Sequence, residues 1–403
     1  MIQREIYMQR IRPFINTEVV KVLTGIRRCG KSVMLQLIQQ ELLKSGVEQK
    51  QILSINFESG STAYAHDASQ TYSFIKNFSE SISSKTYLFL DEIQELKGWE
   101  TIINSCLIDF DVDIYITGSN AKMLSGELAT YLSGRYVEFK IYPFSFEEVC
   151  QSMSGVTVNE VFKIYLVRGG MPFLYQFSLD EQSSKQYLED IYSSIILKDI
   201  AQRNKIRDLE QLKRIILYMI SNVGNTFSVS NISKYLKSVQ RGISMETLYN
   251  YIDYCKTACL FHTVQREELI GKKLLQFQEK IYMTDHGIRE AVYGNNMRDI
   301  NQILENIVYM ELLRNNFAVT VGKVDSEEVD FVAKKGKSII YIQVSYLLAS
   351  EETIEREFGV LEKIPDNYPK YVISMDEIDR GRNGIVHMNI CDFLLAKKRS
   401  WMV

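Results

Sequence analysis

Three observations predict an α/β fold in which a parallel sheet is covered by helices on both faces. Short β-branched and apolar runs alternate with helical segments from residue 19 to about residue 150. The first run, 19–24, passes through a glycine-containing loop directly into a helical segment at 33–43. A later apolar run, 86–90, ends on two acidic residues, as strands of a parallel sheet do where they carry functional carboxylates.

The other segments of this part of the chain follow the same alternation. A helix up to residue 16, broken at Pro13, precedes the first strand. The further strands are expected at 51–58, 112–117 and 136–141, and the further helices at 70–82 and 99–107.

The loop from Gly25 to Ser32 has two glycines separated by four residues and followed by Lys and Ser, which is the phosphate-binding pattern called Walker A. Glycines at these two positions let the backbone wrap closely around a phosphate, so that its N–H groups and the helix N-terminus face the anion. Lys31 then reaches the β- and γ-phosphates, and the Ser32 hydroxyl ligates Mg²⁺. The alternative is a structural glycine turn that happens to precede a lysine. The predicted nucleotide-binding residues are Gly25, Arg28, Cys29, Gly30, Lys31, Ser32 and Val33.

Asp91 and Glu92 follow the strand 86–90 and form a Walker B pattern. At the carboxyl end of a parallel strand, both side chains lie beside the phosphate loop. We expect Asp91, with Ser32, to hold Mg²⁺, and Glu92 to orient and polarise the attacking water. The alternative is that the two acids cap the next segment, 93–96.

Three more polar residues are candidates for catalysis. Ser119 and Asn120 follow the strand 112–117, where a polar side chain contacts the γ-phosphate or the water; either also suits the cap of a following helix. Arg135 follows a glycine at a predicted helix end, and it is the candidate arginine finger, in cis or on the ATP of a neighbouring subunit. A surface ion pair is the alternative role for Arg135.

These motifs together resemble the ATPase core of the AAA+ superfamily, and in particular a prokaryotic family with a C-terminal domain of unknown function. The resemblance is carried by the phrases GIRRCGKS at 25–32, FLDEIQ at 89–94, ITGSN at 116–120 and LSGRY at 132–136, followed by YPFSF at 142–146. It covers nearly the whole chain, and it implies ATP with Mg²⁺ as cofactors but no biological role.

The middle of the chain is predicted to be helical and to end in a winged-helix arrangement. The expected helices are 159–167, 181–203, 209–223, 229–236 and 244–258, and the wing strands are 260–264 and 276–283. Helix 244–258 carries Glu246 and Asp253 against Lys256, which is a poor charge balance for contacting phosphates. A packing or protein-contact surface is therefore favoured, while Arg241, Lys272 and Lys273 keep DNA binding as an alternative.

The last segment resembles the restriction-endonuclease-like nucleases in the order of its elements. A helix at 303–313 displays Glu305 and Glu311, and a strand at 328–332 carries Asp330. The next strand, 338–345, has Gln343 and Ser345 where those nucleases have Glu and Lys. Because Ser cannot supply positive charge, and because residues 279–403 contain 16 Lys and Arg against 20 Asp and Glu, we expect a fold that has lost cleavage.

The sequence thus predicts four regions: a lead-in helix at 1–18, an ATPase core at 19–155, a helical and winged-helix domain at 156–278, and a nuclease-like α/β domain at 279–403. Hydrophobic residues make up 46% of the chain, charged residues 24%, and the net charge is −3, which does not indicate a general nucleic-acid or acidic-membrane binder. No leader or membrane-spanning segment is apparent, so a cytoplasmic protein is expected.

The predicted function is Mg²⁺-dependent ATP binding and hydrolysis, coupled to conformational change in the C-terminal domains. The alternative is a slow nucleotide-dependent switch that binds DNA or a protein partner. A metal-dependent nuclease is a minor alternative. Oligomerisation stays open, because an arginine finger acting in trans requires a neighbouring subunit.

Overall fold

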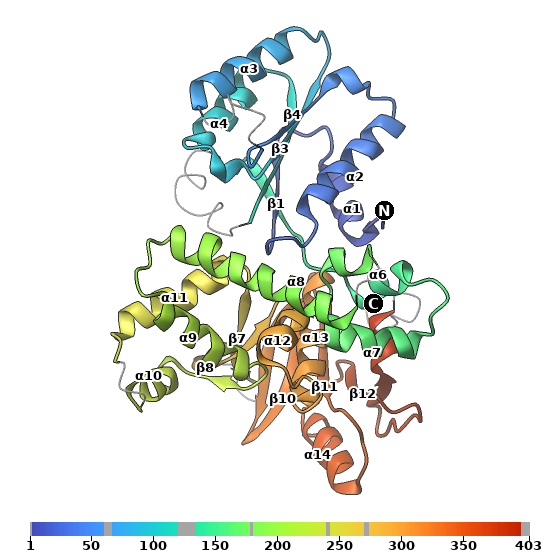
Figure 1. Ribbon diagram of the computed structural model, residues 1–403. Coiled ribbons are helices and arrows are strands. Elements are labelled where there is room, and N and C mark those ends of the chain that lie inside the picture. The colour runs from blue at the N-terminus through green and yellow to red at the C-terminus, as the bar shows by residue number, and fades with distance from the viewer. Residues whose placement is uncertain are drawn as a thin grey trace. The chain divides into compact units, whose positions relative to one another are not determined.

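The computed structural model describes residues 2–59, 67–119, 132, 134–177, 180–238, 242–269 and 274–395 (Figure 1). The chain divides into two compact units. Unit 1 consists of Met1–Pro143 with Thr257–Cys259, and unit 2 consists of Phe144–Lys256 with Leu260–Val403.

Within the described residues, unit 1 contains a five-stranded sheet in the order β2-β3-β4-β1-β5, with all neighbouring strands parallel. The strands are β1 (Val20–Thr24), β2 (Ile52–Asn56), β3 (Thr86–Asp91), β4 (Val112–Gly118) and β5 (Tyr136–Lys140). Every residue of β1, β3 and β4 is buried, as expected for central strands covered on both faces. The predicted fold class is confirmed.

Helices cover both faces of this sheet: in Figure 1, α2 lies on one face, and α3 and α4 lie on the other. Ile75 of α3 and Trp99 and Ile103 of α4 pack into one apolar core with Val20 and Val22 of β1. The described helices of unit 1 are α1 (Glu5–Ile11), η1 (Arg12–Phe14), α2 (Lys31–Lys44), η2 (Gln49–Gln51), α3 (Ala68–Glu80), η4 (Ile93–Glu95) and α4 (Trp99–Asp109). Because the sheet is parallel, the carboxyl ends of β1, β3 and β4 lie at one edge, where the glycine loop begins.

Unit 2 begins with helices in the order that the sequence predicts. They are α6 (Phe146–Ser152), α7 (Val158–Arg168), η6 (Pro172–Tyr175), α8 (Glu181–Ser194), η7 (Ile195–Gln202), α9 (Leu209–Ser221), α10 (Val229–Ser238) and α11 (Met245–Thr257). The later helices are α12 (His286–Tyr293), α13 (Ile300–Arg314), α14 (Glu351–Glu362) and α15 (Ile390–Leu394). The predicted helix 181–203 occurs as α8 continued by η7, a stretch of π-helix.

Asp285 ties α12 to the loop after α7. Its carboxylate accepts hydrogen bonds from the backbone N–H groups of Gly287 and Ile288 at the start of α12, and from Gly170 at 2.7 Å. Gly287 lies so close to α7 that a Cβ there would stand 2.1 Å from the carbonyl oxygen of Arg168. Burial raises the pKa of the Asp285 carboxyl to about 6.

The strands of unit 2 form one mixed sheet, eight-stranded in the part of the chain that the structure describes, in the order β13-β12-β11-β10-β9-β7-β8-β6. The strands are β6 (Thr226–Phe227), β7 (Phe261–Glu268), β8 (Leu274–Met283), β9 (Ala318–Val324), β10 (Glu327–Lys335), β11 (Ser338–Val344), β12 (Lys370–Ser374) and β13 (Val386–Asn389). The β7–β8 hairpin is antiparallel, and β7 pairs in parallel with β9.

The pairing of β7 with β9 joins the predicted wing hairpin to the strands of the last segment. The domain boundary expected between residues 278 and 279 lies inside β8 (Leu274–Met283). The assignment of the two parts of unit 2 as winged helix and nuclease-like domain stays a prediction.

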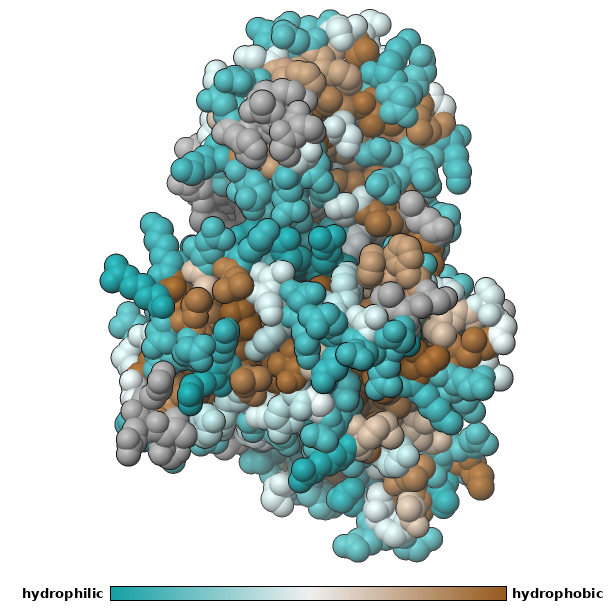
Figure 2. Space-filling view, viewed as in Figure 1, coloured by the Kyte–Doolittle hydropathy of each residue, from teal (hydrophilic) through white to brown (hydrophobic). Residues whose placement is uncertain are grey.

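Hydrophilic residues cover most of the face shown in Figure 2, and hydrophobic residues reach it in patches. In the helical part of unit 2, the large exposed apolar side chains include Leu197, Leu217, Tyr235, Met245 and Tyr249.

No described helix is both long enough and apolar enough to pass through a bilayer.

Candidate functional site

The glycine loop between β1 and α2 has a backbone that only particular residues allow. Gly25 has φ +151°, and a Cβ there would stand 2.1 Å from the carbonyl oxygen of Ile141. Gly30 precedes α2 with φ 102°, and Arg28 also has a positive φ, 67°. No side chain caps the start of α2, so its first N–H groups are directed toward the loop. This is the geometry of an anion-binding loop at a helix N-terminus.

Two buried side chains hold the shape of the loop through hydrogen bonds to backbone carbonyl oxygens. Cys29 is fully buried, and its Sγ–H donates to the carbonyl oxygen of Ile141 at 3.2 Å. The Arg4 guanidinium, only 2% exposed, donates to the carbonyl oxygens of Cys29 at 3.0 Å and of Tyr142 at 2.7 Å. Burial raises the pKa of the Cys29 thiol, so this residue supports the loop as a neutral group. Arg4 was not predicted as a site residue, and nothing local in the sequence distinguishes it from other arginines.

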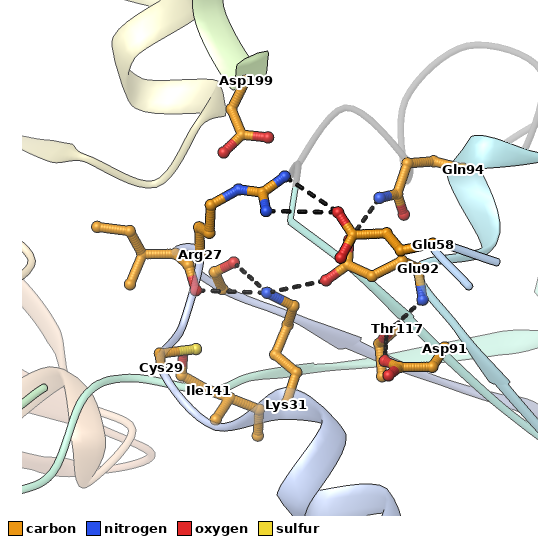
Figure 3. Close-up of polar contacts among 12 residues, drawn as sticks. Arg27, Cys29, Lys31, Glu58, Asp91, Glu92, Gln94, Thr117, Ile141 and Asp199 are labelled. Carbon is orange, nitrogen blue, oxygen red and sulfur yellow. Dashed lines mark hydrogen bonds and ion pairs between the residues drawn. The ribbon is translucent and has the colours of Figure 1, made fainter. Parts of the chain in front are cut away.

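Lys31 is the cation at the centre of the site (Figure 3). Its side chain is 3% exposed, and its Nζ donates to the carbonyl oxygens of Gly25 at 3.1 Å and of Ile26 at 3.3 Å. The same Nζ lies 3.6 Å from Oε1 of Glu92. The structure therefore brings together the predicted phosphate-binding lysine and the predicted catalytic carboxylate.

Asp91 is the last residue of β3 and is 6% exposed. Its Oδ1 accepts from the Thr117 hydroxyl at 2.5 Å, and its Oδ2 accepts from the Asn56 amide at 3.1 Å. Burial raises the pKa of the Asp91 carboxyl, while hydrogen bonds from the hydroxyls of Thr117 and Ser32 act in the opposite direction. The two predicted metal ligands, Ser32 and Asp91, are thus in contact, and their oxygen atoms suit Mg²⁺.

Glu92 adopts the left-handed conformation, with φ 52°, which is uncommon for a residue other than glycine and is often found at functional sites. Its backbone N–H donates to the Thr117 hydroxyl at 2.9 Å, and the Gln94 amide donates to its Oε2 at 2.5 Å. The Glu92 carboxylate is 13% exposed and is held on the same side as Lys31.

Thr117 is a further candidate site residue that the sequence did not single out. It lies near the end of β4, is fully buried, and its one hydroxyl links Asp91 to the backbone of Glu92. One feature of the sequence could have indicated it: Thr117 is a polar residue in an apolar strand, and this strand neighbours the strand that ends in Asp91.

The remaining predicted residues differ in their relation to this edge of the sheet. Ser119 follows β4 at the same edge and is 1% exposed, and Asn120 lies outside the described residues. Arg135 precedes β5, where its carbonyl oxygen accepts from the N–H of Val20 at 2.8 Å. β1 begins at Val20 and ends just before Gly25, so Val20 and Gly25 are about 16 Å apart at the usual rise of a strand. The structure does not bring Arg135 to the loop of its own chain.

Comparisons with known sequences agree with this geometry. Residues 17–150 match the AAA domain family, and residues 159–299 match a domain of unknown function, DUF8612. An uncharacterized protein of Haemophilus influenzae is 39% identical over 404 residues, which cover 98% of this chain and 99% of that protein. An uncharacterized protein of Methanocaldococcus jannaschii is 30% identical over 359 residues, covering 85% of this chain and 78% of that protein.

The solved structures to which this chain is similar have low sequence identity and low TM-scores. AMPPCP-bound DnaA from Aquifex aeolicus is 15% identical, with a TM-score of 0.33 over 62% of this chain and 86% of that chain. The Thermotoga maritima RuvB Holliday junction branch migration motor is 16% identical, with a TM-score of 0.33 over 64% and 89%. Similarity at this level does not extend to what those proteins bind.

The matched AAA domain spans the five-stranded parallel sheet, the glycine loop and the acids at the end of β3. This chain belongs to the same family as the uncharacterized proteins of H. influenzae and M. jannaschii, and its residues 17–150 are an AAA domain.

Proposed function

We propose that unit 1 binds ATP with Mg²⁺ and hydrolyses it. The observation that carries this proposal is the convergence of Lys31, Asp91 and Glu92 at the carboxyl edge of one parallel sheet, beside an uncapped helix N-terminus. A cation, a hydroxyl–carboxylate pair and a second carboxylate are the groups that phosphoryl transfer to water needs.

In the proposed mechanism, the loop backbone and the N-terminus of α2 hold the phosphates. Lys31 exchanges its hydrogen bonds with the carbonyl oxygens of Gly25 and Ile26 for the β- and γ-phosphate oxygens. The Ser32 hydroxyl and Asp91 would hold Mg²⁺, which would supply positive charge to offset the charge that develops on the phosphates.

Glu92 is the proposed base that orients the attacking water. Its backbone is fixed through Thr117 and its carboxylate through Gln94, so the group is positioned before the reaction. Phosphates that engage Lys31 also release Glu92 from its ion pair with this lysine, which frees the carboxylate to accept a proton from water. Ser119 and Asn120 are the proposed contacts to the γ-phosphate.

The test is ATP binding and hydrolysis by the full chain with a Lys31→Ala variant. Fluorescent ATP should bind to the wild-type protein with Mg²⁺ and release of phosphate should follow, whereas Lys31→Ala should lose both. Lys44→Ala is the matched control, because Lys44 is the exposed last residue of the same helix, α2. Equal ATP binding by the Lys31→Ala and wild-type proteins would contradict the proposal.

We also propose that hydrolysis changes the conformation of unit 2, through which a partner is engaged. A protein partner suits the helical part of unit 2 better than DNA does, since Met245 and Tyr249 of α11 are exposed at 41% and 56% beside the acid Glu246. A steep fall of DNA affinity with rising salt would instead identify DNA as the partner.

A further inference from the structure

Arg4 lies directly before α1, and the start of this helix fixes its orientation. Its backbone is left-handed, with φ 49°, which is uncommon for a residue other than glycine. Its carbonyl oxygen accepts hydrogen bonds from the N–H groups of Tyr7 at 2.9 Å and of Met8 at 3.3 Å. Its guanidinium carbon lies 4.6 Å from the centre of the Tyr7 ring, and the two residues are 2% and 1% exposed. A buried cation–π contact thus holds the guanidinium in one position.

The Arg4 guanidinium joins two segments that are far apart in the sequence. Nη1 donates to the carbonyl oxygen of Cys29 in the glycine loop at 3.0 Å, and Nη2 donates to the carbonyl oxygen of Tyr142 after β5 at 2.7 Å. Because the guanidinium is planar and rigid, the two acceptors are held at a fixed separation. The N–H of Tyr142 donates to the Tyr7 hydroxyl at 3.1 Å. Both backbone polar groups of Tyr142 are therefore bound by the segment that begins α1.

The glycine loop also contacts Ile141, the residue before Tyr142. The Cys29 Sγ–H donates to the Ile141 carbonyl oxygen (Figure 3). A Cβ at Gly25 would stand 2.1 Å from the same oxygen, so the loop backbone lies directly against it. The Ile141 N–H donates to the carbonyl oxygen of Thr24 at 2.7 Å. Ile141 thus packs against the loop at both Gly25 and Cys29, and a change in the shape of the loop would displace Ile141 and Tyr142.

The segment that Arg4 holds leads directly into unit 2. The first stretch of unit 1 ends at Pro143, and unit 2 begins at Phe144. Phe144 is fixed in turn: its N–H donates to the carbonyl oxygen of Gly170 at 2.7 Å, and a Cβ at Gly170 would stand 2.2 Å from its carbonyl oxygen. Only Pro143 separates Tyr142 from Phe144, and the proline ring restricts its φ. A displacement of Tyr142 is therefore passed to Phe144 through one stiff residue.

The contacts of Arg4 distinguish coupling from simple support of the loop. If Arg4 only supported the loop, an acceptor within the loop, the carbonyl oxygen of Cys29, would be enough. The same guanidinium also donates to Tyr142, which lies outside the loop. Hydrogen bonds donated by a charged group are about twice as strong as neutral ones, and both of these are buried. The shape of the loop and the position of Tyr142 therefore depend on each other.

We propose that Arg4 is a clamp that couples nucleotide binding at the glycine loop to the chain segment that enters unit 2. The clamp rests on the proposed binding of ATP by this loop, and it adds the route by which binding changes unit 2. Phosphates held by the N–H groups of the loop shift its backbone, and with it the carbonyl oxygen of Cys29. Arg4 transmits the shift to Tyr142, whose displacement reaches Phe144. Because Arg4 acts through the backbone of other residues, it is a positioning residue.

The experiment measures backbone hydrogen–deuterium exchange of residues 139–146 in the full chain, with and without saturating AMPPNP and Mg²⁺. In the wild-type protein, the bound analogue should slow exchange both in the glycine loop and at 139–146. Arg4→Met should bind the analogue about tenfold more weakly, because it loses a charge-assisted hydrogen bond to the loop. Once this variant is saturated, its loop should be protected as in the wild type, whereas exchange at 139–146 should no longer respond. A merely structural role would lower stability and affinity but leave this response intact.

Arg12→Met is the matched control, because Arg12 belongs to the same lead-in segment, but its side chain is 40% exposed and pairs with Glu5 and Glu41. It should bind the analogue and respond at 139–146 as the wild type does. Circular dichroism checks that each variant is folded.

Should Arg4→Met fail to fold, Tyr7→Phe replaces it, since it removes the acceptor of the Tyr142 N–H and keeps the ring against Arg4. The response at 139–146 should then decrease while affinity for the analogue is retained. An unchanged response in the folded variant, or no response at 139–146 in a wild-type protein that binds AMPPNP, would overturn the clamp alone. Failure of the wild-type protein to bind AMPPNP would overturn the proposed function and the clamp together.

Discussion

Lys31 and Glu92 form an ion pair in the AAA domain, with 3.6 Å between Nζ and Oε1. The residue proposed to bind phosphate and the residue proposed to activate water therefore neutralise each other. In the proposed mechanism, both side chains change partners before ATP is hydrolysed, so a substitution of one residue should affect the function of the other.

Replacement of Glu92 by Gln should separate ATP binding from hydrolysis. Lys31 loses a competing anion, so affinity for ATP should be equal to or higher than that of the wild type. Turnover should fall on the order of a hundredfold or more, because the proton acceptor is gone. Single-turnover hydrolysis with titrated fluorescent ATP measures both quantities. Glu95→Gln, an exposed acid in the same turn, is the control, and normal hydrolysis by Glu92→Gln would exclude Glu92 as the base.

Replacement of Thr117 by Val should lower both stability and activity. It removes the donor to Asp91 and the acceptor for the Glu92 N–H in a buried place, at a cost of about 1–3 kcal/mol for each group left unsatisfied. Urea unfolding and the Mg²⁺ dependence of ATP hydrolysis measure the two effects. The matched control is Thr86→Val at the opposite end of β3, because the Thr86 hydroxyl is buried without a hydrogen-bond partner among the described residues. Equal results for the two variants would contradict the linking role of Thr117.

Replacement of Arg135 by Ala tests a role in trans. Arg135 precedes β5, whereas the glycine loop follows the other end of β1, so Arg135 would act on the ATP of a neighbouring subunit. We therefore expect Arg135→Ala to retain ATP binding and to lose hydrolysis because each neighbouring subunit lacks its arginine finger. Mixing inactive Arg135→Ala and Lys31→Ala proteins should restore partial hydrolysis, since each supplies what the other lacks. Lys76→Ala, which removes an exposed lysine of α3, is the control. A mixture that stays inactive, or full activity of Arg135→Ala alone, would count against the role.

Replacement of Asp285 by Asn should have an effect on stability that depends on pH. The folded protein holds a proton on Asp285 up to a pKa of about 6, whereas the unfolded chain releases it near 3.8. The contribution of Asp285 to stability therefore decreases as pH rises from about 4 to about 6, by up to about 3 kcal/mol. Asn does not titrate, so its destabilisation relative to wild type should be largest near pH 4 and smallest near pH 7. Urea unfolding across this range measures the difference, and a constant difference would refute the raised pKa.

The parts of the fold that the sequence predicted are those encoded by neighbouring residues. Each strand of the parallel sheet is a short apolar run, and the loop with Lys31 and Ser32 is defined by glycine spacing. Both features can therefore be predicted from residues that are close together in the sequence. Asp91 and Glu92 were placed beside this loop because the ends of parallel strands meet at one edge.

The parts that the sequence did not predict depend on contacts between distant residues. Arg4 supports the loop through the carbonyl oxygens of Cys29 and Tyr142, and no local pattern indicates such a contact. Lys280 reaches Glu305 only because β8 and α13 pack together. Glu311 was expected beside Glu305 on one helix, yet it is fully buried and accepts a hydrogen bond from Asn315 instead.

The single sheet of unit 2 has a mechanical consequence. Backbone hydrogen bonds join neighbouring strands from β6 through β8, β7 and β9 to β13, so the predicted wing hairpin and the terminal strands belong to one continuous sheet. A displacement of β7 relative to β9 would therefore have to break or shift the backbone hydrogen bonds that pair these two strands.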